Sequence, residues 1–121
     1  MTQDKLVIVS THADEDAERA ILPFVMGIGA LASEADVLIA LQSNAVHLAT
    51  KGYARHLRHE GFPPFEELLE AFLELGGRLV ACTPCLKSRS IGDDELIDGA
   101  RPTAAAELAI EFLTSKAQLT Y

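Results

Sequence analysis

Four consecutive apolar residues, 6–9 (LVIV), give the strongest constraint on the fold, because a half-exposed strand would alternate apolar and polar positions. A strand without that alternation is buried on both faces, as in a parallel sheet that helices cover on both sides. Residues 36–41 (DVLIAL) and 78–81 (RLVA) form further apolar runs along the chain. The sequence therefore predicts an α/β fold, with residues 6–9 as the first and central strand.

Amphipathic segments separate these runs and predict helices. Apolar residues recur at helical spacing over residues 17–31, although Pro23 lies among them and is expected to kink or break that helix. A second helix is predicted over residues 65–75, and Gly76-Gly77 end it. The first strand, the first helix and the second strand then form a unit with a right-handed crossover.

The last part of the chain predicts smaller elements. Residues 98–102 and 118–121 have room only for short strands, and Thr103 is expected to cap a helix between them. The apolar residues expected to face the core from this helix are Leu108, Ile110, Phe112 and Leu113. The prediction is one domain over residues 1–121, a three-layer α/β/α sandwich with a mostly parallel sheet of about five strands.

Charge and composition argue against two kinds of partner. Ten basic and 18 acidic residues give a net charge of −8, and no basic patch offers a nucleic-acid site. The first five residues lack the features of a signal peptide, and no apolar run approaches the roughly 18 residues of a membrane span. We expect a cytoplasmic protein that binds neither nucleic acid nor membrane. In that reducing compartment, its two cysteines are expected to be thiols, transient redox groups or metal ligands.

Reactive side chains converge in one segment, residues 82–90 (CTPCLKSRS). Cys82 follows the third apolar run, and Pro84 suits the first turn of a helix that begins there. Unpaired N–H groups at the helix start, together with Lys87 and Arg89, are expected to lower the pKa of the Cys82 thiol and favour the nucleophilic thiolate. The alternative is a cysteine that only packs in the core, as free cysteines commonly do.

Cys85 lies three residues after Cys82, on the same face of a helix, where it could form a disulfide with Cys82 or support it. A thioredoxin-like dithiol is a rival interpretation of this C-x-x-C spacing. The position of the pair opposes it, because the thioredoxin pair belongs to an early strand-to-helix junction. Here the pair follows two complete strand–helix units.

Polar side chains also follow the first two predicted strands, and functional crevices of open parallel sheets lie beyond the carboxyl ends of the strands. His12 and His47 are candidates to orient Cys82 or to accept its proton, although loop histidines are more often merely solvated. The other candidates for the lining of this crevice are Thr11, Gln42, Ser43 and Asn44.

Metal and cofactor sites find little support in the sequence. A zinc site would need two ligands besides the cysteines, and the spacing of His12, His47, His56 and His59 does not favour one. A second C-x-x-C pair and a glycine-rich phosphate loop are both absent from the sequence. We therefore expect no metal and no cofactor.

Several short motifs together resemble the DsrE/DsrF/TusD-like small proteins of sulfur relay, in particular the single-domain DsrE-like group. The most specific motif is Cys82-Thr83-Pro84-Cys85 with Arg89. The others are residues 6–12 (LVIVSTH), Arg19-Ala20 with Pro23-Phe24, residues 40–42 (ALQ), Lys51-Gly52, residues 61–64 (GFPP) and residues 76–79 (GGRL). Two positions depart from the family pattern: Ser90 stands where glycine commonly follows the arginine, and Ala45-Val46 where glycine-valine is common.

The resemblance implies a function and an assembly. In relatives with a known role, a cysteine at the position of Cys82 carries a persulfide between partner proteins, which implies a sulfur carrier with sulfurtransferase-like chemistry. It also implies homotrimers or hexamers, with other sulfur-carrier proteins as partners. Two alternatives stay open: an oligomeric scaffold or small-ligand-binding protein whose cysteines are incidental, and a Cys82/Cys85 dithiol redox protein.

Overall fold

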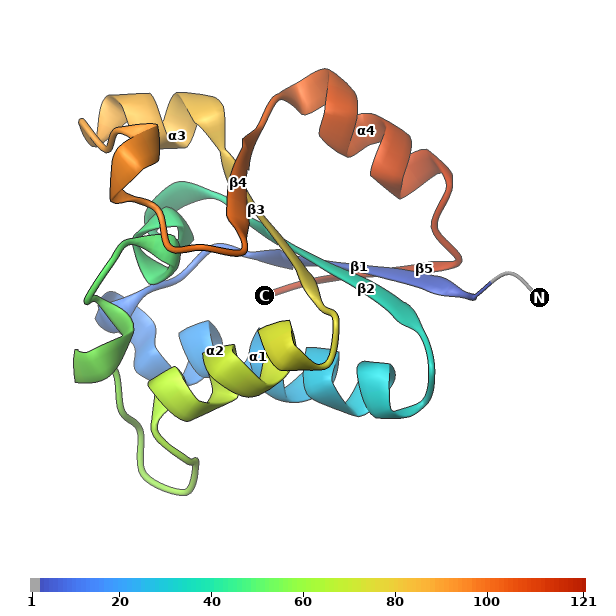
Figure 1. The fold of residues 1–121 in the computed structure, drawn as a ribbon, viewed down its shortest axis with the longest axis horizontal. Helices are drawn as coiled ribbons and strands as arrows, with labels where there is room; N and C mark the ends of the chain where they lie inside the picture. Colours follow the sequence, from blue (N-terminus) through green and yellow to red (C-terminus); the bar gives the residue numbers. More distant parts are fainter. Residues whose placement is uncertain (1–2) are drawn as a thin grey trace.

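The computed structural model describes residues 3–121, so Met1 and Thr2, the start of the predicted domain, lie outside the described residues. Strands and helices alternate along the chain (Figure 1). In chain order the main elements are β1 (Lys5–Ser10), α1 (Ala17–Ala32), β2 (Asp36–Leu41), the 3₁₀ helix η2 (Ser43–Ala49), α2 (Phe65–Glu74), β3 (Arg78–Cys82), α3 (Thr83–Ser88), β4 (Ala100–Thr103), α4 (Ala105–Leu113) and β5 (Ala117–Thr120).

The five strands form one sheet in the order β4-β3-β2-β1-β5, and every neighbouring pair is parallel. The predicted α/β/α fold with about five strands is therefore confirmed. The central strand is β2, however, so the prediction that residues 6–9 form the centre is wrong. The chain adds β2, β3 and β4 on one side of β1, and α4 then returns it to the other side, where only β5 is added. Both faces of β1 are nevertheless covered by helices, with Ile8 in the core under α1 and α2 and Val7 in the group under α4, as its apolar run predicts.

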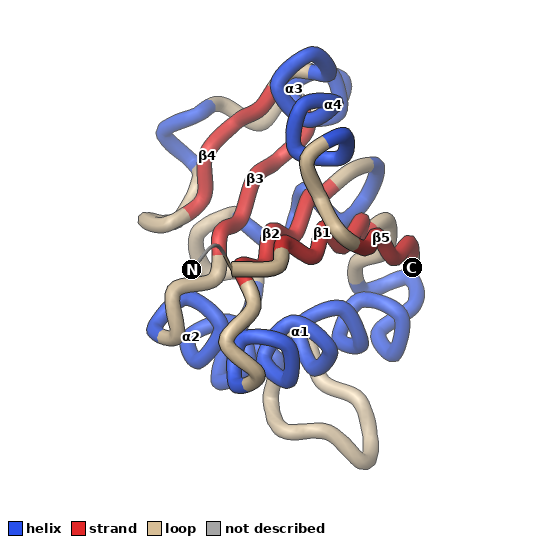
Figure 2. Tube along the Cα trace, turned by 90° about the vertical axis from the view of Figure 1, so that its right-hand side faces the viewer, coloured by secondary structure: helices blue, strands red, loops and turns tan. Residues whose placement is uncertain are grey.

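Helices cover the two faces of the sheet unequally (Figure 2). On one face α1 and α2 bury a large core, in which Phe24 contacts Phe65 and Phe72 edge-on with ring centroids 4.8 and 5.5 Å apart. On the other face α4 packs on a much smaller group of buried residues. These are Val7, Leu38, Ala40 and Leu108, with Val80 and Phe112 partly buried beside them.

Helix α1 runs from Ala17 to Ala32 as one element, with Pro23 inside it. The break that the sequence allowed at Pro23 is therefore not present. A proline removes one helical hydrogen bond, and here the buried residues Ile21 and Phe24 on either side pack into the core. Packing of the apolar face stabilises the helix on both sides of the proline.

The predicted inward face of the last helix is only half right. Leu108 is buried and Phe112 is partly buried, but Ile110 is 62% exposed and Leu113 is 85% exposed. Residues four apart share a helix face, so a helix with Leu108 and Phe112 toward the sheet turns the other two toward solvent. The prediction that Thr103 caps this helix is wrong, because Thr103 is the last residue of β4 and the residue before the helix is Ala104. The Ala104 N–H donates to the Glu107 carboxylate instead.

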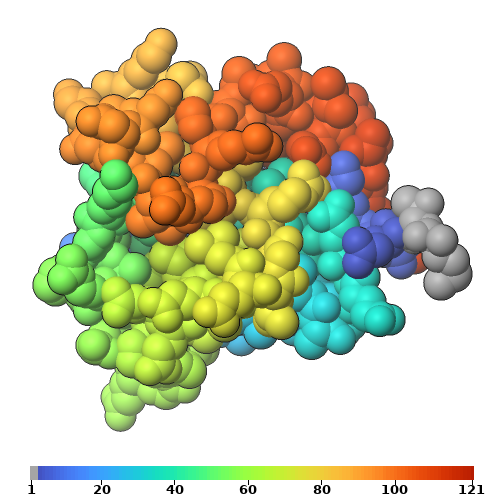
Figure 3. Space-filling view, viewed as in Figure 1, coloured from blue at the N-terminus to red at the C-terminus, as the bar shows by residue number. Residues whose placement is uncertain are grey.

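The segment after α3 folds back against the end of η2. The N–H of Lys51 donates to the Glu95 carbonyl at 2.9 Å, and the N–H of Ile97 donates to the Ala49 carbonyl at 2.8 Å. Figure 3 shows this contact on the surface, where the orange segment lies directly against the green one. The contact therefore joins the segment between α3 and β4 to the segment that follows η2.

None of the helices within residues 3–121 is long and apolar enough to span a membrane.

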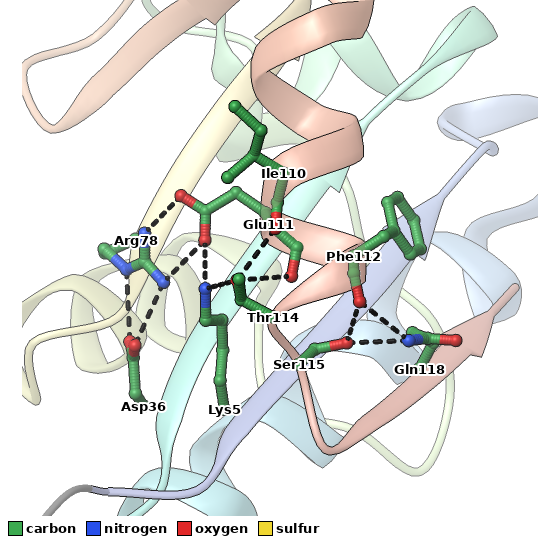
Figure 4. A network of polar contacts seen from close by, with 9 residues as sticks. All are labelled: Lys5, Asp36, Arg78, Ile110, Glu111, Phe112, Thr114, Ser115 and Gln118. Atoms are coloured by element: carbon green, nitrogen blue, oxygen red, sulfur yellow. Dashed lines mark hydrogen bonds and ion pairs between the residues drawn. The ribbon is translucent and has the colours of Figure 1, made fainter.

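One polar network ties α4 to three strands (Figure 4). Glu111 accepts hydrogen bonds from Arg78 Nη1 and from Lys5 Nζ, each at 3.0 Å, while Arg78 also donates to Asp36. The hydrogen bond from Arg78 lowers the pKa of Glu111. Partial burial acts in the opposite direction, and the hydrogen bond from Lys5 lowers the pKa further. The network therefore joins α4 to β1, β2 and β3.

The Glu111→Gln variant is expected to lose about 1 kcal/mol of unfolding free energy at neutral pH, since solvent screens a partly exposed ion pair. Because folding lowers the pKa of Glu111, this contribution is present above the ordinary value of 4.5 and is lost as the pH falls through the folded-state pKa. Urea denaturation of both proteins at several pH values measures the difference. A difference that stays constant down to about pH 3 would contradict this assignment.

Candidate functional site

Cys82 is the last residue of β3 and the residue that precedes the first turn of α3, where the sequence places it. Thr83 and Pro84 are the first two residues of that helix. The Thr83 hydroxyl donates to the Thr103 carbonyl at 2.9 Å, which ties the start of α3 to the end of β4. Cys82 and Cys85 are free thiols, and both are partly exposed at the carboxyl edge of the sheet.

The loop after β2 reaches the cysteine segment, as predicted from the strand ends. The backbone N–H of Ser43 donates to Cys85 Sγ at 3.3 Å. Asn44 Oδ1 accepts two hydrogen bonds from the Arg89 guanidinium, from Nη2 at 3.0 Å and from Nε at 3.3 Å. Arg89 Nη1 also donates to the Cys85 carbonyl at 3.2 Å. These contacts hold the guanidinium beside the two cysteines.

Glu15 connects the loop after β1 to the same cluster. Its carboxylate contacts His12 Nδ1 at 2.8 Å and accepts the N–H of Ala13 at 2.8 Å and the amide of Asn44 at 3.3 Å. Partial burial raises the pKa of Glu15, but these hydrogen bonds outweigh it and the pKa lies below its ordinary value. His12 therefore approaches the site through Glu15 and Asn44, and no direct contact with Cys82 is found among the described residues.

Glu15 was not among the residues predicted for the site. In the sequence it stands within an acidic run, Asp14-Glu15-Asp16, that a helix start explains without any further role. Only the folded structure shows that Glu15 turns toward Asn44 while Asp16 caps α1. The contact between Glu15 and Asn44 depends on how the ends of two strands meet in space, so no local sequence pattern indicates it.

The pKa of Cys82 is raised, so the predicted lowering is wrong. Partial burial is the largest cause, and the neighbouring Cys85 thiol adds to it. The Cys85 backbone N–H and the Arg89 charge act in the opposite direction but do not prevail. The prediction from the sequence considered the nearby cations and the N–H groups at the helix start. It did not consider the burial of the thiol, which raises the pKa.

Alkylation of Cys82 by iodoacetamide is therefore expected to be slow at neutral pH and to accelerate by more than about tenfold between about pH 7 and pH 9, since only the thiolate reacts. A pKa above the ordinary value of 9.0 moves the whole rate profile toward alkaline pH. Peptide mapping at timed intervals measures the rate at Cys82 alone. A rate that has already levelled off near neutral pH would contradict the direction of the shift.

The remaining predicted residues lie around this cluster. Gln42 continues the backbone from β2, and its N–H donates to the Ser10 carbonyl. The Thr11 hydroxyl donates to the Tyr121 carbonyl at 2.6 Å, which joins the loop after β1 to the residue after β5. The His47 ring stacks on the Tyr53 ring, with ring centroids 5.8 Å apart. Lys87 is exposed on α3. The residues that the structure brings together are thus Ser43, Asn44, Cys82, Cys85 and Arg89. His12 is connected to them only through Glu15.

Within residues 3–121, no group of three or more histidine, cysteine and acidic side chains is arranged to hold a metal ion. The residues that are gathered are a thiol pair, a guanidinium and backbone or amide donors. That set suits a sulfur nucleophile whose anionic form is stabilised by a nearby cation.

A family model identifies the fold that carries this site. The model described as the DsrE/DsrF-like family matches residues 4–121. The chain belongs to the DsrE/DsrF-like family. The resemblance stated from the sequence motifs is thereby confirmed, and the chain is a member of a sulfur-relay-like family.

The chain is also similar to individual proteins and solved structures. The uncharacterised protein MJ0989 of Methanocaldococcus jannaschii is 32% identical over 97 residues, which cover 80% of this chain and 82% of that protein. The E. coli YchN crystal structure is 26% identical, with a TM-score of 0.83 over 98% of this chain and 100% of that chain. MTH1491 of Methanobacterium thermoautotrophicum, a protein of unknown function, has a TM-score of 0.70 over 99% of this chain and 100% of that chain, at 12% identity, and shows the fold alone.

Ser90 departs from the family pattern at a position where the backbone explains the usual glycine. Its φ is 56°, in the left-handed region that a side chain disfavours. The turn that follows Arg89 keeps this conformation with a serine in place. The other departure, at Ala45-Val46, falls on two fully buried residues of η2.

Proposed function

We propose that this protein is a sulfur carrier in which Cys82 holds a sulfane sulfur as a transient persulfide. The observation that supports it best is the Arg89 guanidinium, which Asn44 holds by two hydrogen bonds beside the cysteine pair at the strand ends. The Arg89 charge favours the anionic form of the Cys82 sulfur, although burial outweighs it in the resting thiol. Membership of a sulfur-relay-like family supports the same chemistry.

The proposed transfer balances without an added oxidant or reductant. The Cys82 thiolate attacks the outer sulfur of a donor persulfide, a new bond forms between that sulfur and Cys82 Sγ, and the donor thiolate leaves with the electrons of the broken bond. An acceptor thiolate then attacks the outer sulfur on Cys82 in the same way. The Arg89 charge would stabilise the persulfide anion between the two steps.

The test is the intact mass of the protein after brief incubation with inorganic polysulfide and immediate desalting, measured before and after treatment with a reductant. The proposal expects a gain of one sulfur atom per chain that the reductant removes. No gain in mass, or a gain that the reductant leaves in place, would contradict it. In that case a scaffold or ligand-binding role with incidental cysteines would be favoured.

We also propose that the protein forms a homo-oligomer, a trimer or a hexamer, and exchanges sulfur with other carrier proteins. Ile110 and Leu113 are 62% and 85% exposed and lie three residues apart on α4, so they form a shared apolar surface that an assembly could cover. A hollow of 480 Å³ opens over the thinly covered sheet face, with Leu38, Val80 and Leu108 among its lining residues. Light scattering after gel filtration tests the assembly, and a mass near 13.0 kDa would contradict it.

A further inference from the structure

The second cysteine has contacts that the proposed carrier step does not use. The Ser43 N–H donates to Cys85 Sγ at 3.3 Å, and the Cys85 carbonyl accepts from Arg89 Nη1 at 3.2 Å and from the Ser88 hydroxyl at 3.0 Å. Both the sulfur and the backbone of Cys85 are thus held by other parts of the site. A carrier with one working thiol has no need of a second sulfur fixed in this way.

Cys82 precedes the first turn of α3 and Cys85 stands three residues later, so both side chains lie on the same side of that turn. The raised pKa of the Cys82 thiol agrees with this placement, because after burial its next cause is the Cys85 side chain. The two residues are separated by Thr83 and Pro84 at the start of α3, a spacing that permits a disulfide. Once Cys82 carries an outer sulfur, the nearest thiol to its Sγ atom within the described residues is Cys85.

We propose that Cys85 resolves the Cys82 persulfide and releases hydrosulfide. This inference rests on the proposed function, because it needs a loaded Cys82. The Cys85 thiolate attacks Cys82 Sγ, a bond forms between the two cysteine sulfurs, and the bond to the outer sulfur breaks. The proton given up by the Cys85 thiol moves to the outer sulfur, which leaves as HS⁻ with the bonding electron pair. The sulfane sulfur gains two electrons, and the two cysteine sulfurs are oxidised to a disulfide.

The cycle is completed by a dithiol reductant, which supplies two electrons and two protons and returns both cysteines to thiols. The protein then has two outcomes for its bound sulfur. Transfer to an acceptor thiol keeps the sulfur in the sulfane state, whereas attack by Cys85 converts it to sulfide. The choice between them depends on whether an acceptor reaches the outer sulfur before Cys85 reaches the inner one.

The experiment follows the loaded protein over time without added thiol. Wild type, Cys85→Ser and Cys85→Ala are loaded with inorganic polysulfide, desalted, and assayed for released hydrosulfide and for intact mass. Ser33→Ala serves as the matched control, because it removes a hydroxyl at the end of α1, whose contact is with the Gly29 carbonyl, and leaves both thiols and their contacts in place. Circular dichroism confirms that each variant is folded before loading.

Wild type and Ser33→Ala are expected to release one hydrosulfide per loaded chain and to end lighter than the reduced protein by two hydrogens. Both Cys85 variants should load equally well and release hydrosulfide at least about tenfold more slowly. Loaded Cys85 variants that release hydrosulfide at the wild-type rate would overturn this inference and leave the carrier function intact. Failure of every protein to load would overturn the proposed function, and this inference with it.

Discussion

Replacement of Cys82 by serine is expected to abolish persulfide loading, while replacement of Cys85 by serine leaves the loaded yield close to that of wild type. Cys82 ends β3 at the carboxyl edge of the sheet, and the Arg89 charge favours its anion. A hydroxyl at this position cannot attack sulfane sulfur under the same conditions, so the expected loss is complete. Intact mass after incubation with inorganic polysulfide measures the loaded fraction of each variant.

Equal loading of Cys82→Ser and wild type would show that the acceptor sulfur had been wrongly assigned. Loss of loading in both serine variants would instead indicate that the two thiols accept sulfur only as a pair. Because each change replaces one partly exposed sulfur atom by oxygen, the fold is expected to survive in both. Thermal melts of the two variants provide the control for misfolding.

Substitution of Gly77 by alanine is expected to destabilise the fold by about 2 kcal/mol or more, because it overpacks the core. Gly77 follows α2, and a Cβ atom there would lie 2.5 Å from Cε1 and Cε2 of Phe72. The Phe72 ring is fully buried and packs edge-on against Phe24, so it has no free space into which to move. Urea denaturation of the variant and of wild type measures the loss.

The matched control is Gly29→Ala. Gly29 lies inside α1, and a Cβ atom there would meet no other atom within 4 Å. This change should raise the unfolding free energy by about 0.5–1 kcal/mol, because alanine is the better helix former. The packing account of Gly77 fails if Gly77→Ala stays within about 0.5 kcal/mol of wild type. It also predicts that Phe72→Leu, by removing ring atoms, restores part of the loss when combined with Gly77→Ala.

The sequence predicted the elements of the fold because their signals are local. Continuous apolar runs mark β1 and β2, and the helical spacing within α2 ends at Gly76-Gly77 as expected. The order of the strands is not a local property: β2, β3 and β4 all lie on one side of β1 and only β5 lies on the other, so β2 is the central strand. The outward turn of Ile110 and Leu113 depends likewise on which side of α4 meets the sheet.

The candidate site divides in the same way. Cys82 could be placed from the apolar run before it and the proline after it, and the strand-end rule brought Ser43 and Asn44 to the same edge. The direction of the Cys82 pKa shift could not be predicted, since burial and the Cys85 contact exist only in the folded chain. The Ser43 N–H is a backbone group that nearly every residue type has, so the amino-acid sequence does not indicate that it donates to sulfur.

The most direct test of the account is to locate the added sulfur in wild-type protein. The protein is loaded briefly with inorganic polysulfide, trapped with an alkylating reagent and digested with trypsin, which places both cysteines in the peptide of residues 79–87. Fragmentation before Pro84 separates Cys82 from Cys85. The account predicts the additional sulfur on the fragment that contains Cys82. Additional sulfur on the fragment that contains Cys85, or on neither fragment, would contradict it.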